Sequence, residues 1–407
     1  MSVTGGQQQT ALGLLRALQP HWRSDPNLPG RIQRLLGSRR DFGSRDRRLY
    51  RELIYTTLRY LPWVEPELTR DTQRAIALIA WLAADTRDTH RFRAETAAGW
   101  PEAGTLVERA SHLGLEPDAL LPDWLRVECP SAFEPAEREA LLRRAPLWLR
   151  LQTDDDEAVA SEFQERGWRW RVSPVLSTAW QLLDEADVTR TEAYARGRVE
   201  IQDLASQLLL EAVLGRKGYR ILTALDACAG AGGKTLQLAR LLGPHARIDA
   251  HDIRSDALAE LRARASRANL PNVQVLADPP RTTGSAPYDL VLVDAPCSGS
   301  GTWRRAPHLK WTVTAETVAT RSRTQRELLA KFAGHVRTGG LLIYATCSLA
   351  RSENEGVISD FLRAHAGFHP VPLTQTFGFE AAEEGMTILP ARHDTDGFFV
   401  AALQRAE

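Results

Sequence analysis

The stretch Leu225–Thr235, LDACAGAGGKT, decides the fold of this chain. It joins a short apolar lead-in to clustered glycines and a Gly-Lys-Thr ending, so a phosphate-binding loop is the first pattern to test. That pattern, G-x-x-x-x-G-K-[ST], needs its first glycine at position 228, where the sequence has Cys228. Asp226, Cys228, Gly230 and Gly232 alternate instead as D-x-C-x-G-x-G. The spacing therefore argues against a P-loop nucleotide hydrolase.

Small residues in such a loop let the backbone approach a ligand closely, and a helix that starts directly afterwards supplies free N–H groups. The alternation resembles the D-x-G-x-G-x-G turn that follows the first strand of class I methyltransferases. A purely structural strand-to-helix turn remains the alternative at this point. The residues of the loop that would line a cofactor are Cys228, Ala229, Gly230, Ala231, Gly232, Gly233 and Lys234.

The sequence around and after this loop alternates strands with helices. Apolar strands are expected at 220–227, 246–253, 273–278, 288–296 and 340–348, with DGFFVAALQ at 396–404 as a closing edge strand. Helical spacing separates them, as in 255–270 and 315–336. Near-continuous apolar strands between helices predict an α/β fold, with a parallel sheet covered on both faces. Ligands bind beyond the carboxyl ends of the strands in such sheets.

The chain before residue 201 divides into two further parts. Residues 1–130 carry apolar residues at helical spacing between proline-bearing breaks, which predicts an all-helical domain. Residues 131–200 predict a small α+β module, with strands PLWLRLQ and WRWRV around a helix. Trp168 and Trp170 alternate at strand spacing, so we expect them to share a core face. Residues 201–407 form the third domain.

Composition excludes several classes of protein. The 407 residues are 43% apolar and 25% charged, and no 18-residue apolar run predicts a membrane span. No signal peptide is expected at the polar start, and the four cysteines suit neither a metal site nor a disulfide framework, so we expect a reducing cytoplasm. The net charge is zero. The arginine-rich segment 21–60 is either a phosphate-contacting surface or a solvated helix face.

Acids and thiols fall where the expected strands end. Asp252 closes the second strand, where an acid commonly holds ribose hydroxyls, and Asp278 closes the third, near the place of an adenine ring. Each could instead be a helix N-cap. Asp294 and Cys297 end the fourth strand in DAPCSGSG, and Cys347 ends the fifth in YATCS. One such cysteine could be a small buried hydrophobe, but two at adjacent strand ends indicate a shared site.

Three motifs carry a family resemblance. DACAGAGGKT, DAPCSGSGTWRRAPHLKW and YATCSLARSENE resemble the signatures of the RNA cytosine-C5 methyltransferases of the Sun/Fmu type. RVEIQDLASQL and DGFFVA resemble further segments, so the match covers about 140–405. The helical part is similar, more loosely, to the NusB-like RNA-binding domain of the bacterial ribosomal RNA enzymes. The resemblance implies a Rossmann-like class I methyltransferase domain; Ala231 stands where the family usually has proline.

The resemblance also implies roles. S-adenosyl-L-methionine would be held by the glycine loop with Asp252, Asp278 and Asp294. Cys347 would be the nucleophile that adds to C6 of cytosine, Asp294 the acid that meets N3, and Cys297 a participant in product release. Lys234 would lie against the target base, and it is also a candidate for the positive charge that favours a thiolate.

The same resemblance names the partner. It implies RNA as substrate, small-subunit rRNA first, with tRNA or a non-catalytic RNA-binding role as alternatives; the oligomeric state stays open, a monomer being plausible. In TWRRAPHLKW, the residues Arg304, Arg305 and Lys310 could hold phosphates. Trp303 and Trp311 could stack on a base, or both could be core residues.

Overall fold

The computed structural model describes residues 3–102, 104–215, 219–280 and 288–406. The chain forms two compact units, Met1–Arg144 with Thr302–Ala315 and Ala145–Gly301 with Glu316–Glu407, which we call the helical unit and the sheet unit. The first division falls at Arg144 and not at the expected residue 130, because Leu142 packs into the core of the helical unit. Within the described ranges, no helix has the length and apolar character needed to cross a membrane.

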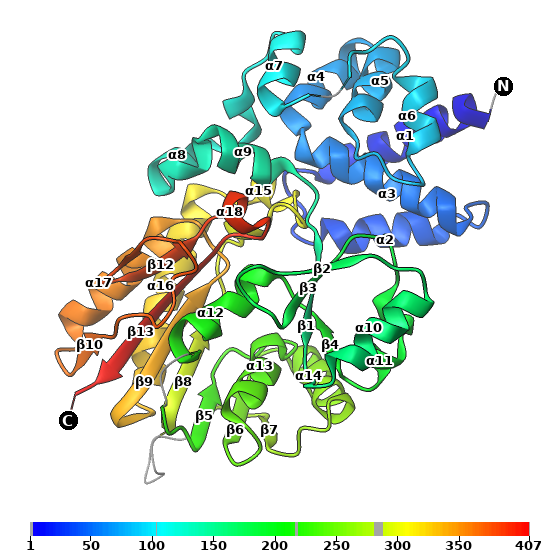
Figure 1. Ribbon diagram of the computed structural model, residues 1–407. Coiled ribbons are helices and arrows are strands. Elements are labelled where there is room, and N and C mark those ends of the chain that lie inside the picture. Colours follow the sequence, from blue (N-terminus) through cyan, green and yellow to red (C-terminus); the bar gives the residue numbers. More distant parts are fainter. Residues whose placement is uncertain (1–2, 103, 216–218, 281–287, 407) are drawn as a thin grey trace. The chain divides into compact units, whose positions relative to one another are not determined.

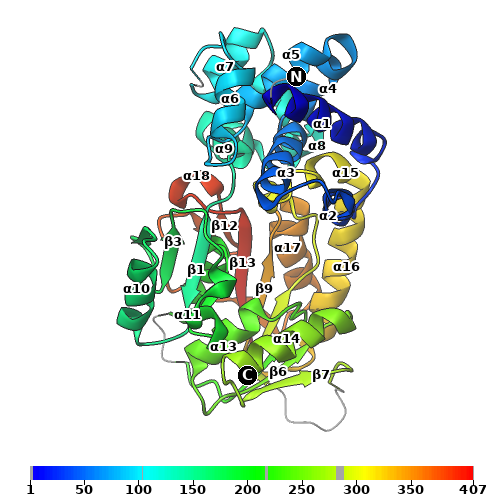
Figure 2. The same ribbon diagram turned by 90° about the vertical axis from the view of Figure 1, so that its right-hand side faces the viewer.

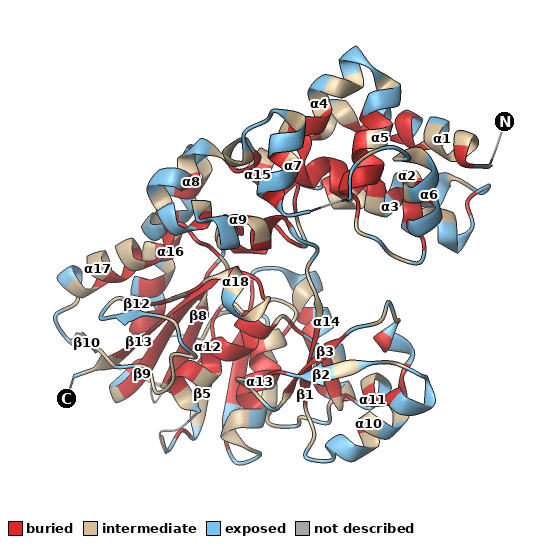
Figure 3. Cartoon of the chain, turned by 45° about the horizontal axis from the view of Figure 1, so that its top comes forward, coloured by how far each residue is buried: buried red, intermediate tan, exposed pale blue. Residues whose placement is uncertain are grey.

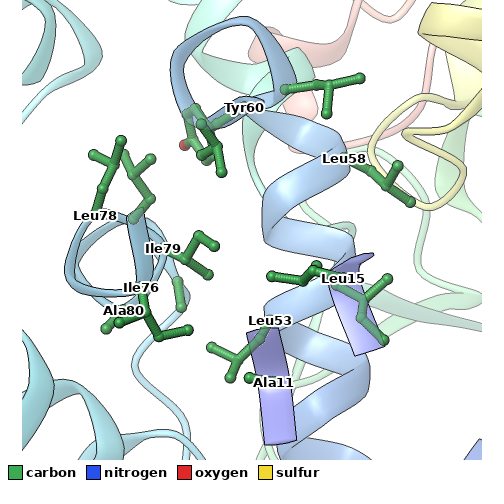
Figure 4. Packing of buried hydrophobic residues seen from close by; sticks show 14 of the residues in the cluster. Ala11, Leu15, Leu53, Leu58, Tyr60, Ile76, Leu78, Ile79 and Ala80 are labelled. Carbon is green, nitrogen blue, oxygen red and sulfur yellow. The ribbon is translucent and has the colours of Figure 1, made fainter. Parts of the chain in front are cut away.

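The helical unit is built from amphipathic helices around one apolar core. Its longer helices are α1 (Val3–Leu18), α2 (Leu28–Ser38), α3 (Ser44–Arg59), α4 (Leu61–Arg70), α5 (Thr72–Leu82), α6 (His90–Thr96), α7 (Leu106–Leu113), α8 (Asp123–Glu128) and α9 (Pro135–Leu142). Leu15 of α1, Leu53 of α3 and Ile76 and Ile79 of α5 meet in that core, as Figure 4 shows. The Asp71 side chain starts α5 by accepting hydrogen bonds from the Gln73 and Arg74 amides.

Residues 302–315 add a segment, including α15 (Leu309–Thr312), to this helical unit. The Lys310 ammonium is buried and donates to the carbonyl oxygens of Arg59 at 2.7 Å and Leu120 at 3.1 Å. Trp303 is fully buried, and the Trp311 indole donates to the Leu58 carbonyl at 2.5 Å. The core interpretation is therefore confirmed for Trp303, whereas Trp311 is partly buried and packs against the core of the helical unit.

The expected phosphate contacts of Arg304 and Lys310 are wrong for the same reason. Each side chain is 1% exposed, and Arg304 donates to the Arg144 carbonyl within the helical unit. A buried cation must find acceptors, and backbone carbonyls from distant parts of the chain supply them here. The TWRRAPHLKW motif alone does not indicate that these backbone carbonyls are the hydrogen-bond acceptors.

The sheet unit contains a nine-stranded sheet in the order β11-β12-β13-β9-β8-β5-β6-β7, with β10 also paired to β13 (Figure 1). Its strands are β5 (Thr223–Asp226), β6 (Arg247–His251), β7 (Val273–Leu276), β8 (Tyr288–Asp294), β9 (Val336–Thr346), β10 (Phe368–Pro370), β11 (Ala381–Ala382), β12 (Gly385–Ile388) and β13 (Phe398–Arg405). Strands β5 to β9 are parallel, which confirms the α/β prediction. β10 to β13 run antiparallel, so the sheet is mixed.

The prediction of a closing edge strand is wrong for β13. It pairs with β9 on one side and with β12 and β10 on the other. Six consecutive residues from Phe398 to Leu403 are buried, because both faces and both edges of this strand are covered. The short β12 gives too weak a period-two signal for the sequence to announce it.

Helices cover both faces of the large sheet. α12 (Leu204–Leu214), α13 (Gly233–Leu242) and α14 (Ser255–Arg267) pack on one face, with Leu208, Leu238 and Leu261 in the apolar contacts. α16 (Ala315–Ala333) and α17 (Glu355–Ala364) pack on the other through Leu329 and Phe361 (Figure 2). Buried residues consequently run along β8, β9 and β13, coloured red in Figure 3.

A second, four-stranded antiparallel sheet belongs to the same unit. Its order is β2-β3-β1-β4, from β1 (Leu147–Leu151), β2 (Trp170–Val172), β3 (Ala179–Leu182) and β4 (Val199–Ile201), with α10 (Asp156–Glu165) packed on it. Trp168 and Trp170 lie partly buried on its core, and Trp170 stacks on Trp180 at 5.6 Å. The fully buried Arg150 of β1 donates to the Gly233 carbonyl at 2.8 Å, which ties this small sheet to the glycine loop.

Candidate active site

The glycine loop follows β5 and leads directly into α13. Gly230 and Gly232 have φ of 53° and 89°, a region where only glycine is comfortable. A Cβ on Gly232 would lie 2.7 Å from Cγ of Leu261 in α14. The tight approach of loop and helix is therefore what requires glycine here. The Ala231 carbonyl accepts a hydrogen bond from Arg264 at 2.8 Å.

Asp252 lies one residue beyond β6 and holds this loop. Its carboxylate accepts hydrogen bonds from the Gly230 amide at 2.8 Å and from the Arg254 amide at 2.9 Å. The Arg254 guanidinium, whose side chain is 63% exposed, also pairs with it at 3.0 Å. Burial acts to raise the pKa of Asp252, but the bonds from Arg254 and Gly230 outweigh burial and lower it. Asp252 is thus a carboxylate beside the loop.

Asp278 is placed differently. It lies exposed, two residues beyond β7, and among the described residues it makes no hydrogen bond to the glycine loop or to Asp252. Its contact with an adenine ring stays a prediction.

Asp226, the last residue of β5, is a site residue to which sequence reasoning gave no role. It is fully buried, and the Thr235 hydroxyl donates to it at 2.7 Å. Burial raises its pKa to about 7; the Thr235 bond lowers that pKa and the nearby charge of Asp294 raises it. The acid that opens the D-x-C-x-G-x-G motif is the signal that could have singled it out.

The glycine loop meets the end of β8 through an ion pair. The Lys234 ammonium lies 2.8 Å from the Asp294 carboxylate, with side chains 9% and 29% exposed. Lys234 also sits 5.1 Å from the ring centre of Phe398 in β13. In this structure the positive charge of Lys234 is therefore paired with the Asp294 carboxylate and not with a cysteine sulfur.

Two thiols lie together at the neighbouring strand ends. β8 and β9 are parallel neighbours that pair Asp294 with Ala345, so Cys297 and Cys347 leave the sheet at the same edge. Their sulfur atoms are 3.3 Å apart, and neither cysteine is in a disulfide. The hydrogen bond with Cys347, burial, and the charges of Cys347 and Glu353 raise the pKa of Cys297. Cys297 is accordingly the thiol that keeps its proton.

The loop after Cys297 is fixed by close backbone packing. Gly299 has φ of 71°, and a Cβ on Gly301 would overlap the Gly397 carbonyl. The Gly301 amide donates to the Cys347 carbonyl at 3.0 Å, and the Gly397 amide donates to the Gly301 carbonyl at 2.8 Å. These bonds hold the two thiol-bearing turns at one place.

The remaining cysteines do not join this pair. Cys228 lies in the glycine loop, and burial together with nearby carboxylates raises its pKa, so it stays a thiol. Cys129 is buried in the helical unit.

A buried glutamate completes the arrangement. Glu353 is fully buried and accepts hydrogen bonds from residues that directly follow each thiol, Ser298 and Ser348. The sequence analysis quoted this residue within YATCSLARSENE but gave it no role. An acidic residue just before a helix is commonly explained by interactions with the helix N-terminus, so the sequence does not indicate that its partners are Ser298 and Ser348.

Comparison with known families adds independent information. Residues 220–404 match the profile of a family described as 16S rRNA methyltransferase RsmB/F. A ribosomal RNA small subunit methyltransferase B from Xanthomonas campestris pv. campestris is 30% identical over 399 residues, covering 89% of this chain and 90% of the relative. Its counterpart from Klebsiella pneumoniae is 33% identical over 307 residues, covering 73% and 68%.

Solved structures agree on the fold. A methyltransferase homolog protein from Pyrococcus horikoshii superposes with a TM-score of 0.59 at 25% identity, covering 74% of this chain and 98% of that one. NSun6 from the same organism, solved with SFG, gives a TM-score of 0.61 at 20% identity, covering 70% and 98%.

Proposed function

Because the chain belongs to the 16S rRNA methyltransferase RsmB/F family, we propose that it methylates C5 of a cytosine in small-subunit rRNA with S-adenosyl-L-methionine as methyl donor. The chain is an RNA methyltransferase by family; the donor, the target atom and the route are the proposal. One observation carries it: two thiols from neighbouring strands lie 3.3 Å apart, next to a Lys–Asp pair and a glycine loop.

The residues present fit the methyl donor. Gly232 leaves no room for a side chain, α13 begins at Gly233 with free N–H groups, and the Asp252 carboxylate lies against the loop. Asp252 would bind the ribose hydroxyls in place of the exposed Arg254 guanidinium. When bound, this donor supplies an electrophilic methyl group.

Cys347 is the proposed nucleophile. Cytosine C5 is a poor nucleophile, and a thiolate that adds at C6 turns the ring into an enamine whose C5 can attack a methyl group. A thiolate needs stabilisation, and the Cys297 S–H, whose sulfur lies 3.3 Å from the Cys347 sulfur, can donate a hydrogen bond to it while keeping its proton. Release requires that the C5 proton leave to water and that the C6–sulfur bond break, with its electron pair returning to the Cys347 sulfur. The Cys297 S–H, whose sulfur lies 3.3 Å away, can donate a hydrogen bond to that departing thiolate, which suits it to the release step.

Asp294 and Lys234 are proposed to manage charge on the base. Negative charge builds on the pyrimidine as sulfur adds, so a proton must reach N3. We assign the transfer of this proton to Asp294, whose carboxylate is paired with the Lys234 ammonium at 2.8 Å once the proton has gone. C5 and C6 of a paired cytosine are stacked within a helix, so the target base is unpaired or extruded.

The choice of rRNA rests on the names of the relatives, and tRNA is the alternative. Bisulfite sequencing of both RNA pools from cells with and without the gene tests it: a cytosine protected only when the gene is present identifies the target. A protected tRNA position with unchanged rRNA would contradict the choice.

Two single variants test the thiol roles. Cys297→Ala should accumulate a covalent protein–RNA adduct on denaturing gels, because addition proceeds while release fails. Cys347→Ala should give neither adduct nor methylation. An adduct with Cys347→Ala and none with Cys297→Ala would mean that the two roles are reversed.

A further inference from the structure

Glu353 lies in the short 3-10 turn Arg351–Glu353 between β9 and α17, and its carboxylate is fully buried. One oxygen accepts from the Ser298 amide at 2.8 Å and from the Gln325 side-chain amide at 3.0 Å. The other accepts from the hydroxyls of Ser298 and Ser348, both at 2.5 Å. Four donors from three separate segments therefore converge on one carboxylate.

The partners are the residues that follow the two thiols. Ser298 comes directly after Cys297, and Ser348 directly after Cys347. A third hydroxyl, from Ser300, lies 3.1 Å from the Ser348 hydroxyl and accepts from the Leu349 amide. One carboxylate thus links two turns that lie about 50 residues apart in sequence.

The partners also select the charged form of Glu353. Two of the four donors are N–H groups, which cannot accept a hydrogen bond, so a carboxylate that accepts everywhere satisfies the site. Burial raises the pKa of Glu353 overall, and the hydrogen bonds from Ser298, Ser348 and Gln325 act in the opposite direction by stabilising the carboxylate. Its negative charge in turn acts to raise the pKa of the Cys297 thiol.

A neutral amide would serve a purely structural role here. The two serine hydroxyls can rotate to accept hydrogen bonds from a glutamine side chain, so the shape and most of the bonds would survive. Burying a charge costs more than burying an amide. The presence of a carboxylate next to two thiols therefore calls for a role of its charge.

We propose, on the premise of the function above, that Glu353 is a positioning residue: its carboxylate fixes the two thiol-bearing turns against each other and keeps the proton of the thiol pair on Cys297. It touches neither substrate nor cofactor in this role and acts through Ser298 and Ser348. The consequence is that Cys347 is the sulfur that attacks C6.

The test compares Glu353→Gln with Glu355→Gln. Glu355 is a nearby control, because it is a partly buried glutamate whose pKa is likewise raised by burial, but its side-chain hydrogen bond comes from Thr387 at 3.1 Å. Iodoacetamide labelling of Cys297 is followed by peptide mass spectrometry across pH, in the free protein without RNA or methyl donor. We expect the midpoint for Glu353→Gln to fall by about one pH unit, which is about tenfold faster labelling below the midpoint. Glu355→Gln should match the unaltered protein; a Glu353→Gln profile that coincides with it would overturn the proposal.

Glu353→Asp separates charge from placement, and covers the case in which the glutamine variant fails to fold. It keeps the carboxylate but shortens its reach, so the labelling midpoint should stay while kcat for methylation falls about tenfold or more with KM for the donor unchanged. A midpoint that moves with Glu353→Asp, or an unchanged kcat, would contradict it. The labelling measurement needs no methylation, so an inactive unaltered protein would defeat the proposed function without deciding the role of Glu353.

Discussion

Replacing Gly232 by alanine tests the glycine loop most specifically. A Cβ there would lie 2.7 Å from Leu261 Cγ and 3.2 Å from Leu236 Cδ1, and the backbone has φ of 89°. The left-handed conformation costs alanine about 1–2 kcal/mol, and overpacking adds about 1–3 kcal/mol. Gly232→Ala should therefore lower the free energy of unfolding by about 2–5 kcal/mol.

Two other glycines of the same helix separate these contributions. Gly243 has φ of 76° and ψ of 177°, a conformation nearly confined to glycine, with nothing within 4 Å of its Cβ position, so Gly243→Ala should show a backbone cost alone, about 1–3 kcal/mol. A Cβ on Gly233 would meet only Gln202 at 3.8 Å, so Gly233→Ala should change the free energy of unfolding by less than about 0.5 kcal/mol.

The assay is denaturant unfolding of the three variants, with calorimetric titration of S-adenosyl-L-methionine. Gly232→Ala should bind the donor at least about tenfold more weakly, while Gly243→Ala should bind it normally, because only the first displaces the loop. In a Leu261→Ala background the cost of Gly232→Ala should fall toward its backbone part, about 1–2 kcal/mol, because the closest side chain is gone. A cost of Gly232→Ala that stays the same in the Leu261→Ala background, or unchanged donor affinity in Gly232→Ala, would refute the reasoning.

Three further predictions concern charged groups. The pKa of Asp226 is about 7 in the folded protein and 3.8 in the unfolded chain, so the free energy of unfolding should fall by about 4 kcal/mol as pH rises from about 4 to about 7. Asp226→Asn should flatten this pH dependence in unfolding experiments. An unchanged pH dependence would assign it to another group. Asp294→Asn leaves the Lys234 ammonium without its carboxylate partner, so methylation should be lost and the free energy of unfolding should fall by about 1–3 kcal/mol. Full activity of this variant in a methyl-transfer assay would remove Asp294 from the mechanism. If the helical unit binds RNA, Arg40→Ala, at an exposed position, should reduce the slope of log affinity for RNA against log salt concentration by about 1. Lys310→Met should leave this slope unchanged, because the Lys310 ammonium donates its hydrogen bonds to backbone carbonyls. The reverse result would restore Lys310 as a phosphate contact.

The central part of the fold could be read from the sequence. Strands β5 to β9 and their helices follow from apolar runs and helical spacing, because β5, β6, β8 and β9 are largely buried and the edge strand β7 keeps a short run of apolar residues. The strand ends then place Asp252, Asp294, Cys297 and Cys347 along one edge of the sheet, since parallel neighbours end together.

The parts that could not be read depend on distant partners. Lys310 resembles a surface phosphate ligand until the carbonyls of Arg59 and Leu120 come within reach, and no local pattern encodes that encounter. β13 also pairs with β12, a strand of four residues, which is too short for an alternation of apolar and polar residues to be recognised in the sequence. Glu353 lies just before a helix, and its hydrogen bond with the Ser298 amide joins it to the end of another strand. The sequence alone does not indicate this contact.

Peptide mapping of a trapped adduct tests the central claim most directly. Cys297→Ala is incubated with substrate RNA and S-adenosyl-L-methionine, the covalent complex is isolated and digested with protease and nuclease, and the linked nucleotide is located by tandem mass spectrometry. We expect a single 5-methylcytidine nucleotide attached through C6 to the peptide that contains Cys347. A nucleotide on any other residue, or a complex that carries no methyl group and forms equally well with Cys347→Ala, would contradict the account.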